Sequence, residues 1–398
     1  MRILKYTPGF LFLLFILTMV GCNRKASIIK SRTTEGQFKV VGYLHSGNFD
    51  QIDAIELQRL THLDIAFANP DREGHLHFRN TGQLKMVVDK GHEAGLQVFL
   101  SIAGGGIDST LASYWLNVLQ PDKRESFITE IIEFTEQYDL DGIDVDIEWN
   151  LIPTITELYT PFVKDLGAAL HKRDKGISSA LNVSGLHPSV SQEALMAYDF
   201  INVMVYDKTG IWRPDIIGPH APFEYAEEAL KYWTEERKIP KEKLTLGVPF
   251  YGHDFDAVRY ISYQKILEKD PLNAYRDEVG KIFYNGIPTI VEKTKLAKKS
   301  FGGVMIWELS NDSFNELSLL RAIDQTLKAG CDTEQIKSYF LDQDGDGYGD
   351  PGHPLQACST PKGYVENRLD CDDTDSNVHP GAKELKNGKD NNCDGVLE

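Results

Sequence analysis

The stretch Asp141-Gly-Ile-Asp144-Val-Asp146-Ile-Glu148-Trp149 alternates acidic and apolar side chains. In a β-strand, alternate side chains point to one face, so Asp144, Asp146 and Glu148 should form one acidic row. The apolar residues between them would face the opposite layer. Burial of three like charges raises their pKa values, and proteins retain such rows mainly where proton transfer needs them. An exposed acidic loop or a metal-binding turn is the alternative, but neither would alternate so regularly with β-branched residues.

Eight apolar, β-rich runs recur between residues 37 and 330, separated mostly by longer stretches with helical patterning, such as 124–137 and 154–172. Eight alternating β and α units predict a (β/α)8 TIM barrel. An open doubly wound sheet would need a Gly-x-Gly-x-x-Gly loop after the first strand, and residues 42–47 lack that spacing. The expected strands are 39–44, 62–69, 97–103, 142–149, 177–183, 200–206, 244–251 and 303–309.

Length and charge limit the classes of partner. The 398 residues allow one large domain and a small one. A net charge of −17 argues against nucleic acid and anionic lipid as partners, but leaves neutral sugars unaffected. We expect a monomer that binds no nucleic acid.

The first 21 residues have the pattern of an export signal. Basic Arg2 and Lys5 precede an apolar run of residues 10–20, which is too short to span a bilayer stably. The run ends in Met19-Val-Gly-Cys22, which resembles a bacterial lipobox and implies lipidation of Cys22; an ordinary secretory signal is the alternative. Polar residues 22–36 would be a tether. We therefore expect an exported protein of the bacterial cell envelope, an outer-membrane lipoprotein or cell-surface protein, that touches the membrane only through this lipid.

The composition changes after residue 331, which predicts a separate module over 331–398. From residue 332 onward there are 15 acidic and 6 basic residues. The module also holds the remaining cysteines, Cys331, Cys358, Cys371 and Cys393. An even number in an exported protein suggests two disulfides, for which three pairings are possible.

Aspartates in this module are spaced like calcium ligands. A first cluster lies within residues 342–350, and others within 370–375 and 390–395. Position 12 of the first loop is His353 and not Glu, so the loop is not an EF-hand; it resembles thrombospondin type 3 repeats. Oxygen ligands favour a structural Ca²⁺, remote from catalysis, over a transition metal; a disordered acidic tail is the alternative. The expected ligands are Asp342, Asp344, Asp346, Asp350, Asp372 and Asp390.

Four motifs, each at an expected strand end, resemble the glycoside hydrolases of family 18. The acidic row matches that family's Asp-x-x-Asp-x-Asp-x-Glu, and Met204-Val-Tyr206-Asp207 matches its Met-x-Tyr-Asp. Ser101-Ile-Ala-Gly104-Gly105 is similar to its Ser-x-Gly-Gly element, with Ala103 as an extra residue. Gly303-Val-Met-Ile-Trp307 matches the terminal tryptophan motif. The resemblance covers nearly all of residues 37–330 and implies a catalytic barrel there.

The resemblance implies a substrate-assisted retaining mechanism without a catalytic cofactor. Glu148 would be the general acid and then the base, and the substrate's own acetamido oxygen would be the nucleophile. Asp146 would orient the acetamido N–H, and Asp144 would share a proton with it. Tyr206 would donate to the acetamido carbonyl, and Trp307 would form the apolar floor under the sugar.

The implied substrate carries β-1,4 linkages next to N-acetylglucosamine, with chitin or chito-oligosaccharides as the first choice. An endo-β-N-acetylglucosaminidase of N-glycan cores and a non-catalytic chitin- or glycan-binding lectin are the alternatives. Intact Glu148 argues against the lectin. Tyr43 and Phe67 are candidate sugar-binding aromatics, with core packing as the alternative. The expected substrate-binding residues are Trp307, Asp207, Met204, Tyr43, Phe67, Gly104 and Gly105.

Substrate choice within the family depends on one further feature. Many of its chitinases carry an α+β insertion after the seventh strand that walls a deep groove. Only about 50 residues separate Tyr251 from Gly302 here. This spacing predicts no such insertion and a shallow, open cleft suited to bulky glycans, whereas retained Asp207 favours a chitinase.

Overall fold

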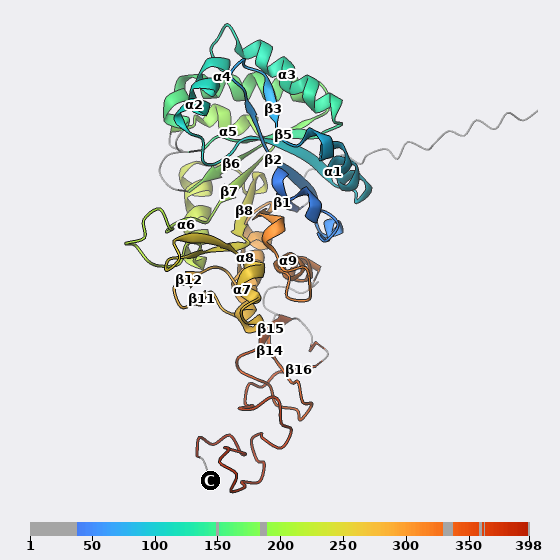
Figure 1. Cartoon of the computed structure of the whole chain (residues 1–398), viewed down its shortest axis with the longest axis vertical. Coiled ribbons are helices and arrows are strands. Elements are labelled where there is room, and N and C mark those ends of the chain that lie inside the picture. The colour runs from blue at the N-terminus through green and yellow to red at the C-terminus, as the bar shows by residue number, and fades with distance from the viewer. Residues whose placement is uncertain are drawn as a thin grey trace, which may run out of the picture. The chain divides into compact units, whose positions relative to one another are not determined.

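A computed structural model describes residues 38–148, 151–183, 189–328, 337–357, 360–361 and 363–396 (Figure 1). The expected signal, Cys22 as the expected lipidation site and the expected tether lie outside these residues. Within the described segments, no helix is both long and apolar enough to cross a membrane.

Eight parallel strands close into a barrel, which confirms the predicted fold. Neighbouring strands pair in the order β1-β13-β8-β7-β6-β5-β4-β2, and β1 also pairs with β2, which closes the ring. Seven of the eight runs overlap their strands within about two residues, but β5 ends at Asp146, before Glu148. The strands are β1 Lys39–His45, β2 His62–Pro70, β4 Gln97–Ala103, β5 Gly142–Asp146, β6 Gly176–Asn182, β7 Phe200–Met204, β8 Leu244–Pro249 and β13 Gly303–Trp307.

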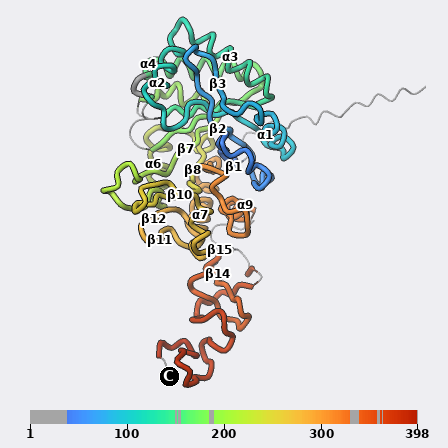
Figure 2. The backbone as a smooth tube through the Cα atoms, in the orientation of Figure 1, coloured from blue at the N-terminus to red at the C-terminus, as the bar shows by residue number. Residues whose placement is uncertain are grey.

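Helices cover the outside of the barrel, as Figures 1 and 2 show. Their apolar stripes produce this arrangement: in α3, Phe127, Ile128, Ile131 and Ile132 recur at helical spacing and are all buried. Side-chain caps fix some starts, such as Asp108, which accepts from the Leu111 N–H at the start of α2. The helices are α1 Thr81–Glu93, α2 Ser109–Val118, α3 Arg124–Gln137, α4 Ile152–His171, α5 Gln192–Ala197, α6 Phe223–Lys231, α8 Ile287–Ser300 and α9 Leu319–Lys328.

Two apolar layers hold the barrel together. The larger lies between strands and helices and includes Leu63, Leu100 and Val145. The smaller fills the barrel interior and includes Phe99, Phe200 and Met305. Because alternate residues of a strand face opposite layers, the same strands also aim polar side chains into the barrel.

An α+β insertion follows β8, so the predicted absence of one is wrong. Four short antiparallel strands form a sheet in the order β10-β9-β12-β11. Two of these strands have two residues and two have four, too few to give a readable alternation. The insertion comprises β9 Tyr251–Asp254, β10 Arg259–Ser262, α7 Tyr263–Leu267, β11 Glu278–Val279 and β12 Ile282–Phe283; a further short strand, β3 Leu76–Phe78, pairs with β2.

The acidic module contains a small antiparallel sheet, made of β14 Lys337–Leu341, β15 Pro354–Ala357 and β16 Tyr364–Val365. A disulfide joins Cys371 to Cys393, with the two Cα atoms 5.8 Å apart. This bond is one of the two expected. Cys331 and Cys358 lie outside the described residues.

Candidate active site

A pocket of about 1230 Å³ opens at the carboxyl ends of the barrel strands. Barrel enzymes build their sites at this end from the loops that follow the strands. The pocket brings most of the predicted residues together, although they are far apart in sequence. Those that line it are Tyr43, Phe67, Gly105, Asp146, Glu148, Met204, Tyr206, Asp207 and Trp307.

Asp144 lies at the bottom of the acidic row and is fully hydrogen-bonded. Its carboxylate accepts from Tyr43 Oη, Ser101 Oγ and Ser178 Oγ, each at 2.7 Å. Burial raises the pKa of Asp144, and these donors oppose the rise. Tyr43 therefore serves the carboxylate network with its hydroxyl while its ring packs against Trp307, at 5.5 Å between ring centroids.

Asp146 and Glu148 are less well satisfied. One oxygen of Asp146 (Oδ1) is buried with no hydrogen-bond partner among the described residues. Burial and the neighbouring carboxylates of Glu148 and Asp144 raise the pKa of Asp146 well above its usual value. Burial, followed by the charge of Asp207, raises the pKa of Glu148 to about 7. A carboxyl that binds a proton near neutral pH is suited to general acid catalysis.

Asp64 is a fourth buried carboxyl beneath the row, and the sequence reasoning missed it. It points into the barrel from β2, and Asn202 Nδ2 lies 3.4 Å from its Oδ2. Its Oδ1 has no partner within the described segments, and burial followed by the charge of Asp144 raises its pKa well above the usual value. The sequence could have revealed it, because Asp64 lies between apolar Leu63 and Ile65. If those two face the helices, Asp64 faces the barrel interior.

Aromatic rings form the floor and one wall of the pocket. Trp307 and Phe67 stack with an interplanar angle of 20° and 5.6 Å between centroids. The Tyr206 hydroxyl lies 3.8 Å from Met305 Sδ, a weak acceptor, so its proton remains available to a ligand. Met204, two residues before Tyr206, lines the same pocket.

The two adjacent glycines provide space. A Cβ on Gly104, whose φ is +88°, would lie 2.6 Å from the Phe67 ring. A Cβ on Gly105 would lie 2.7 Å from an oxygen of Glu148. Only glycine at these positions lets the loop after β4 approach the ring and the acid so closely.

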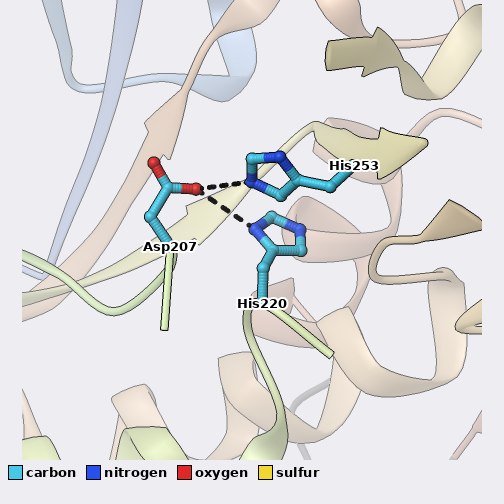
Figure 3. A group of neighbouring side chains, drawn as sticks. All are labelled: Asp207, His220 and His253. Atoms are coloured by element: carbon cyan, nitrogen blue, oxygen red, sulfur yellow. Dashed lines mark hydrogen bonds and ion pairs between the residues drawn. The ribbon is translucent and has the colours of Figure 1, made fainter. Parts of the chain in front are cut away.

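Asp207 is the centre of a cluster of donors shown in Figure 3. Its Oδ1 accepts from Tyr251 Oη at 2.6 Å and lies 2.9 Å from His253 Nε2 and 3.4 Å from His220 Nδ1. Burial tends to raise the pKa of Asp207, but hydrogen bonds from both histidines outweigh it and lower that pKa. Two imidazoles and a carboxylate can also hold a metal. Here the facing atoms already satisfy one another, so we interpret the group as a hydrogen-bond cluster.

The insertion and the loop after β7 supply the mouth of the pocket. Trp212 and Tyr260 line it with 50% and 56% of their surfaces exposed. Both rings pack near His253, with centroids at 5.3 Å and 4.8 Å. Exposed aromatics at a cleft rim are suited to stacking on sugar rings. The sequence reasoning missed them together with the insertion.

The family model of glycosyl hydrolases family 18 matches residues 39–312, which comprise the barrel and the whole pocket lining. The chain belongs to this family. Its membership explains why motifs from four separate strands converge on one pocket.

Known structures support the same assignment. A family 18 chitinase from the chitin utilization locus of Flavobacterium johnsoniae is 40% identical, with a TM-score of 0.70 over 73% of this chain and 94% of that one. A chitinase from Bacteroides thetaiotaomicron is 29% identical, with a TM-score of 0.66 over 73% of this chain and 97% of that one. A chitinase-like effector of Moniliophthora roreri is 29% identical over 54% of this chain. The chain spans 58% of that relative's length, less than two thirds.

The acidic module of this family 18 hydrolase groups its aspartates differently from the prediction. Asp342, Asp344 and Asp346 converge as expected, but Asp344 also meets Asp370 and Asp373, which lie in the second predicted cluster and were not among the expected ligands. Crowding leaves Asp344 Oδ2, Asp346 Oδ2 and Asp370 Oδ2 buried without partners among the described residues. Burial, followed by the charges of Asp370 and Asp344, raises the pKa of Asp373 to about 6.

The other three predicted ligands have different contacts. Asp350 is paired with His353, Asp372 accepts from Lys389 Nζ at 3.0 Å, and Asp390 accepts from the Gly395 N–H at 2.7 Å. None of them belongs to a convergent group within the described residues. A family model for a metal-binding motif matches residues 370–398, so part of the acidic cluster lies inside the match and part precedes it.

Proposed function

We propose that this enzyme cleaves β-1,4 linkages next to N-acetylglucosamine in chitin or chito-oligosaccharides, with retention and by substrate-assisted catalysis. One observation carries the proposal. Glu148, whose pKa is raised to about 7, lies in the pocket beside Asp146, which has an unpartnered acceptor oxygen. Glu148 can protonate the glycosidic oxygen of a sugar, and the Asp146 oxygen can accept a hydrogen bond from an amide N–H on the same sugar.

Glu148 is the proton donor in this mechanism. In its neutral form it protonates the glycosidic oxygen, and in its ionised form it later takes a proton from water. Gly105 leaves room for the carboxyl to rotate between these tasks, because a Cβ at that position would lie 2.7 Å from Glu148. The charge of Asp207 contributes to keeping Glu148 protonated before the reaction.

Asp146 and Tyr206 hold the acetamido group. The unpartnered Oδ1 of Asp146 accepts the acetamido N–H, and the Tyr206 hydroxyl donates to the acetamido carbonyl oxygen. These two bonds fix the amide so that its oxygen attacks the anomeric carbon and closes an oxazolinium ion. Orientation of this kind replaces a protein nucleophile.

Asp144 accepts the proton of Asp146 during the reaction. Three hydroxyl donors stabilise its ionised form. Asp146 Oδ1 has no partner among the described residues, and burial raises the pKa of Asp146 well above its usual value, so Asp146 is the protonated member of the pair in this mechanism. When the oxazolinium ion forms, the positive charge favours an ionised Asp146, and its proton can pass toward Asp144. The total charge of the two carboxyls stays the same, but the negative charge moves from Asp144 to Asp146, next to the positive charge that develops on the substrate.

Chitin is the preferred substrate over an N-glycan core. The α+β insertion is present and contributes Tyr260 to the pocket lining, so the reason for expecting a shallow glycan cleft no longer holds. The bacterial relative that is 40% identical is described as a chitinase from a chitin utilization locus. Trp307 and Phe67 offer a stacked apolar floor for a pyranose ring.

Product analysis on chitin oligomers, run beside a high-mannose glycoprotein, tests the proposal. We expect cleavage of the oligomers, no release of the glycan, and loss of cleavage in the Glu148→Gln variant. Glycan release without oligomer cleavage would favour the endo-β-N-acetylglucosaminidase. Tight binding of both substrates without cleavage of either would favour a lectin.

We also propose that the enzyme is exported and anchored through a lipid on Cys22. The Cys371–Cys393 disulfide supports an oxidising location outside the cytoplasm. Replacement of Cys22 by Ser should abolish incorporation of labelled palmitate and release the enzyme from membranes. Unchanged membrane association would contradict the anchor.

For the acidic module we propose a structural Ca²⁺ held by Asp342, Asp344, Asp346, Asp370 and Asp373. Asp370 is 3% exposed and has an unpartnered oxygen in this cluster, which suits a cation. All the donors are hard carboxylate oxygens, as Ca²⁺ prefers. Calorimetric titration with Ca²⁺ and Cu²⁺ tests this choice, because tighter binding of Cu²⁺ would overturn it.

A further inference from the structure

Two buried histidines surround Asp207 and belong to none of the motifs described above. His220 lies in the loop after β7, and His253 lies on β9 of the insertion; both are fully buried. Each ring aims one nitrogen at Asp207 Oδ1, as Figure 3 shows. Their own rings are 4.7 Å apart between centroids. The pair therefore encloses the carboxylate on the side of the insertion.

The contacts of the far ring nitrogens indicate that both imidazoles are neutral. His220 Nε2 and His253 Nδ1 are buried with no hydrogen-bond partner among the described residues. A proton on either atom would be buried without an acceptor, which is costly. The stable tautomers thus carry hydrogen on His220 Nδ1 and His253 Nε2, and both donate to Asp207. Burial also lowers the pKa of His220.

Neutral donors have an electrostatic consequence for the general acid. They stabilise the negative charge of Asp207 without adding a positive charge that would cancel it. Asp207 can therefore act on Glu148 as a full anion. Six titratable groups face this cluster from the surrounding elements: Glu148 after β5, Tyr206 after β7, Tyr225 on α6, Tyr251 on β9, Tyr260 on β10 and Lys293 on α8.

We propose that His220 and His253 are positioning residues which, as neutral N–H donors, hold Asp207 as an anion beside Glu148 and so set the upper pH limit of hydrolysis. The inference rests on the proposed role of Glu148 as the acid. Loss of both donors leaves Tyr251 as the remaining hydrogen-bond donor to Asp207 Oδ1 among the contacts described. The partly exposed carboxyl, 35% of whose side-chain surface is accessible, then protonates or turns away from the pocket. Glu148 loses its anionic neighbour and ionises at lower pH.

The pH profile of kcat/KM on a chitin oligomer tests this role, because its alkaline limb reports ionisation of the acid in the free enzyme. The variant His220→Leu/His253→Leu lacks both donors, and we expect its limb to move about one pH unit lower. The matched control His220→Asn/His253→Gln keeps an N–H near each position and should keep the limb within roughly 0.3 unit of wild type. Equal shifts in both variants would indicate loss of packing and overturn the proposal.

A double-mutant cycle separates action through Asp207 from any other effect. In an Asp207→Asn background the alkaline limb of the kcat/KM profile should already lie at lower pH. Removal of the two histidine donors should then shift it no further. An additional shift of the same size as in wild type would contradict the proposal.

Nitrogen NMR of the histidines in the wild-type enzyme tests the same idea without a variant or a substrate. We expect a neutral Nδ1–H tautomer for His220 and a neutral Nε2–H tautomer for His253 at pH 7. A cationic ring at that pH would overturn the proposal. Because this readout needs no turnover, it also separates failure of the inference from failure of the proposed function.

Discussion

The barrel and the acidic module both bring carboxylates together, but they accommodate them differently. In the barrel, Asp144 receives three hydroxyl donors, and Asp64 and Asp146 have strongly raised pKa values. In the module, the donors to Asp342 and Asp346 are backbone N–H groups of the same loop. Buried oxygens of both sites lack partners among the described residues, but only the barrel site adds hydroxyl donors from neighbouring strands.

The two sites balance their negative charge by different means. A rigid barrel with hydroxyl side chains can hold a proton and move it among neighbouring carboxyls, which serves acid catalysis. A short loop without such donors needs a cation to balance its charge. We therefore expect protons to control the barrel site and a metal to control the module.

The largest effect should come from Glu148→Gln, which removes the mobile proton from the barrel while keeping side-chain shape. Hydrolysis of a chitin oligomer should fall by about 10²–10⁴-fold or more. Binding of the oligomer, followed by calorimetry, should persist because the pocket is unchanged. Retention of more than a tenth of the activity would show that another group supplies the proton.

Tyr206→Phe should have the next largest effect. It removes the proposed donor to the acetamido carbonyl but leaves every carboxyl in place. We expect kcat to fall by roughly 10²–10³-fold, as for loss of one oxyanion donor, while KM changes little. A rise in KM alone would mean that Tyr206 only binds the substrate.

The sequence predicted the barrel well because each strand buries a run of apolar residues. The strand limits for residues 97–103 were correct to the residue, as were those of the helix at 124–137. It also identified Asp144, Asp146 and Glu148 as neighbours, since their separation along the chain is short. Alternation places Asp144 and Asp146 on the inner face of β5, whereas Glu148 follows the end of that strand.

The missed residues have a common cause. Asp64, His220 and His253 gain their importance from partners that are 138, 13 and 46 residues away along the chain, which no local pattern reveals. The insertion was missed because two of its strands are only two residues long. Asp372 was predicted as a metal ligand in place of Asp370 and Asp373, because sequence spacing does not show in which direction a turn points a carboxylate.

Removal of the proposed Ca²⁺ should affect only the module. With EDTA, we expect limited proteolysis after residue 337 to accelerate roughly 100-fold, as for loss of a ligand present at 100 times its dissociation constant. Hydrolysis of chitin oligomers should stay within about twofold, because the barrel balances its charge with protons. Loss of hydrolysis on chelation would show that the barrel site also depends on a metal.

Asp64→Asn should have the smallest effect, seen in stability against pH. The folded-state pKa of Asp64 is raised, so the folded protein keeps a proton that the unfolded chain releases above about pH 4. The wild type therefore loses stability as pH rises toward the folded pKa, whereas an amide carries no such cost. We expect the free energy of unfolding of the variant to exceed that of wild type by about 1–3 kcal/mol at pH 8, and by less at pH 4. An equal gap at both pH values would show that Asp64 ionises normally.

Substrate-assisted catalysis is tested most directly by weakening the proposed nucleophile. The measurement is kcat for an aryl chitobioside compared with its N-trifluoroacetyl analogue, in which fluorine withdraws electrons from the amide oxygen. We expect kcat to fall by at least roughly tenfold, corresponding to about 1.4 kcal/mol in the barrier. An unchanged kcat would contradict participation of the acetamido group and would assign the nucleophile to the protein or to water.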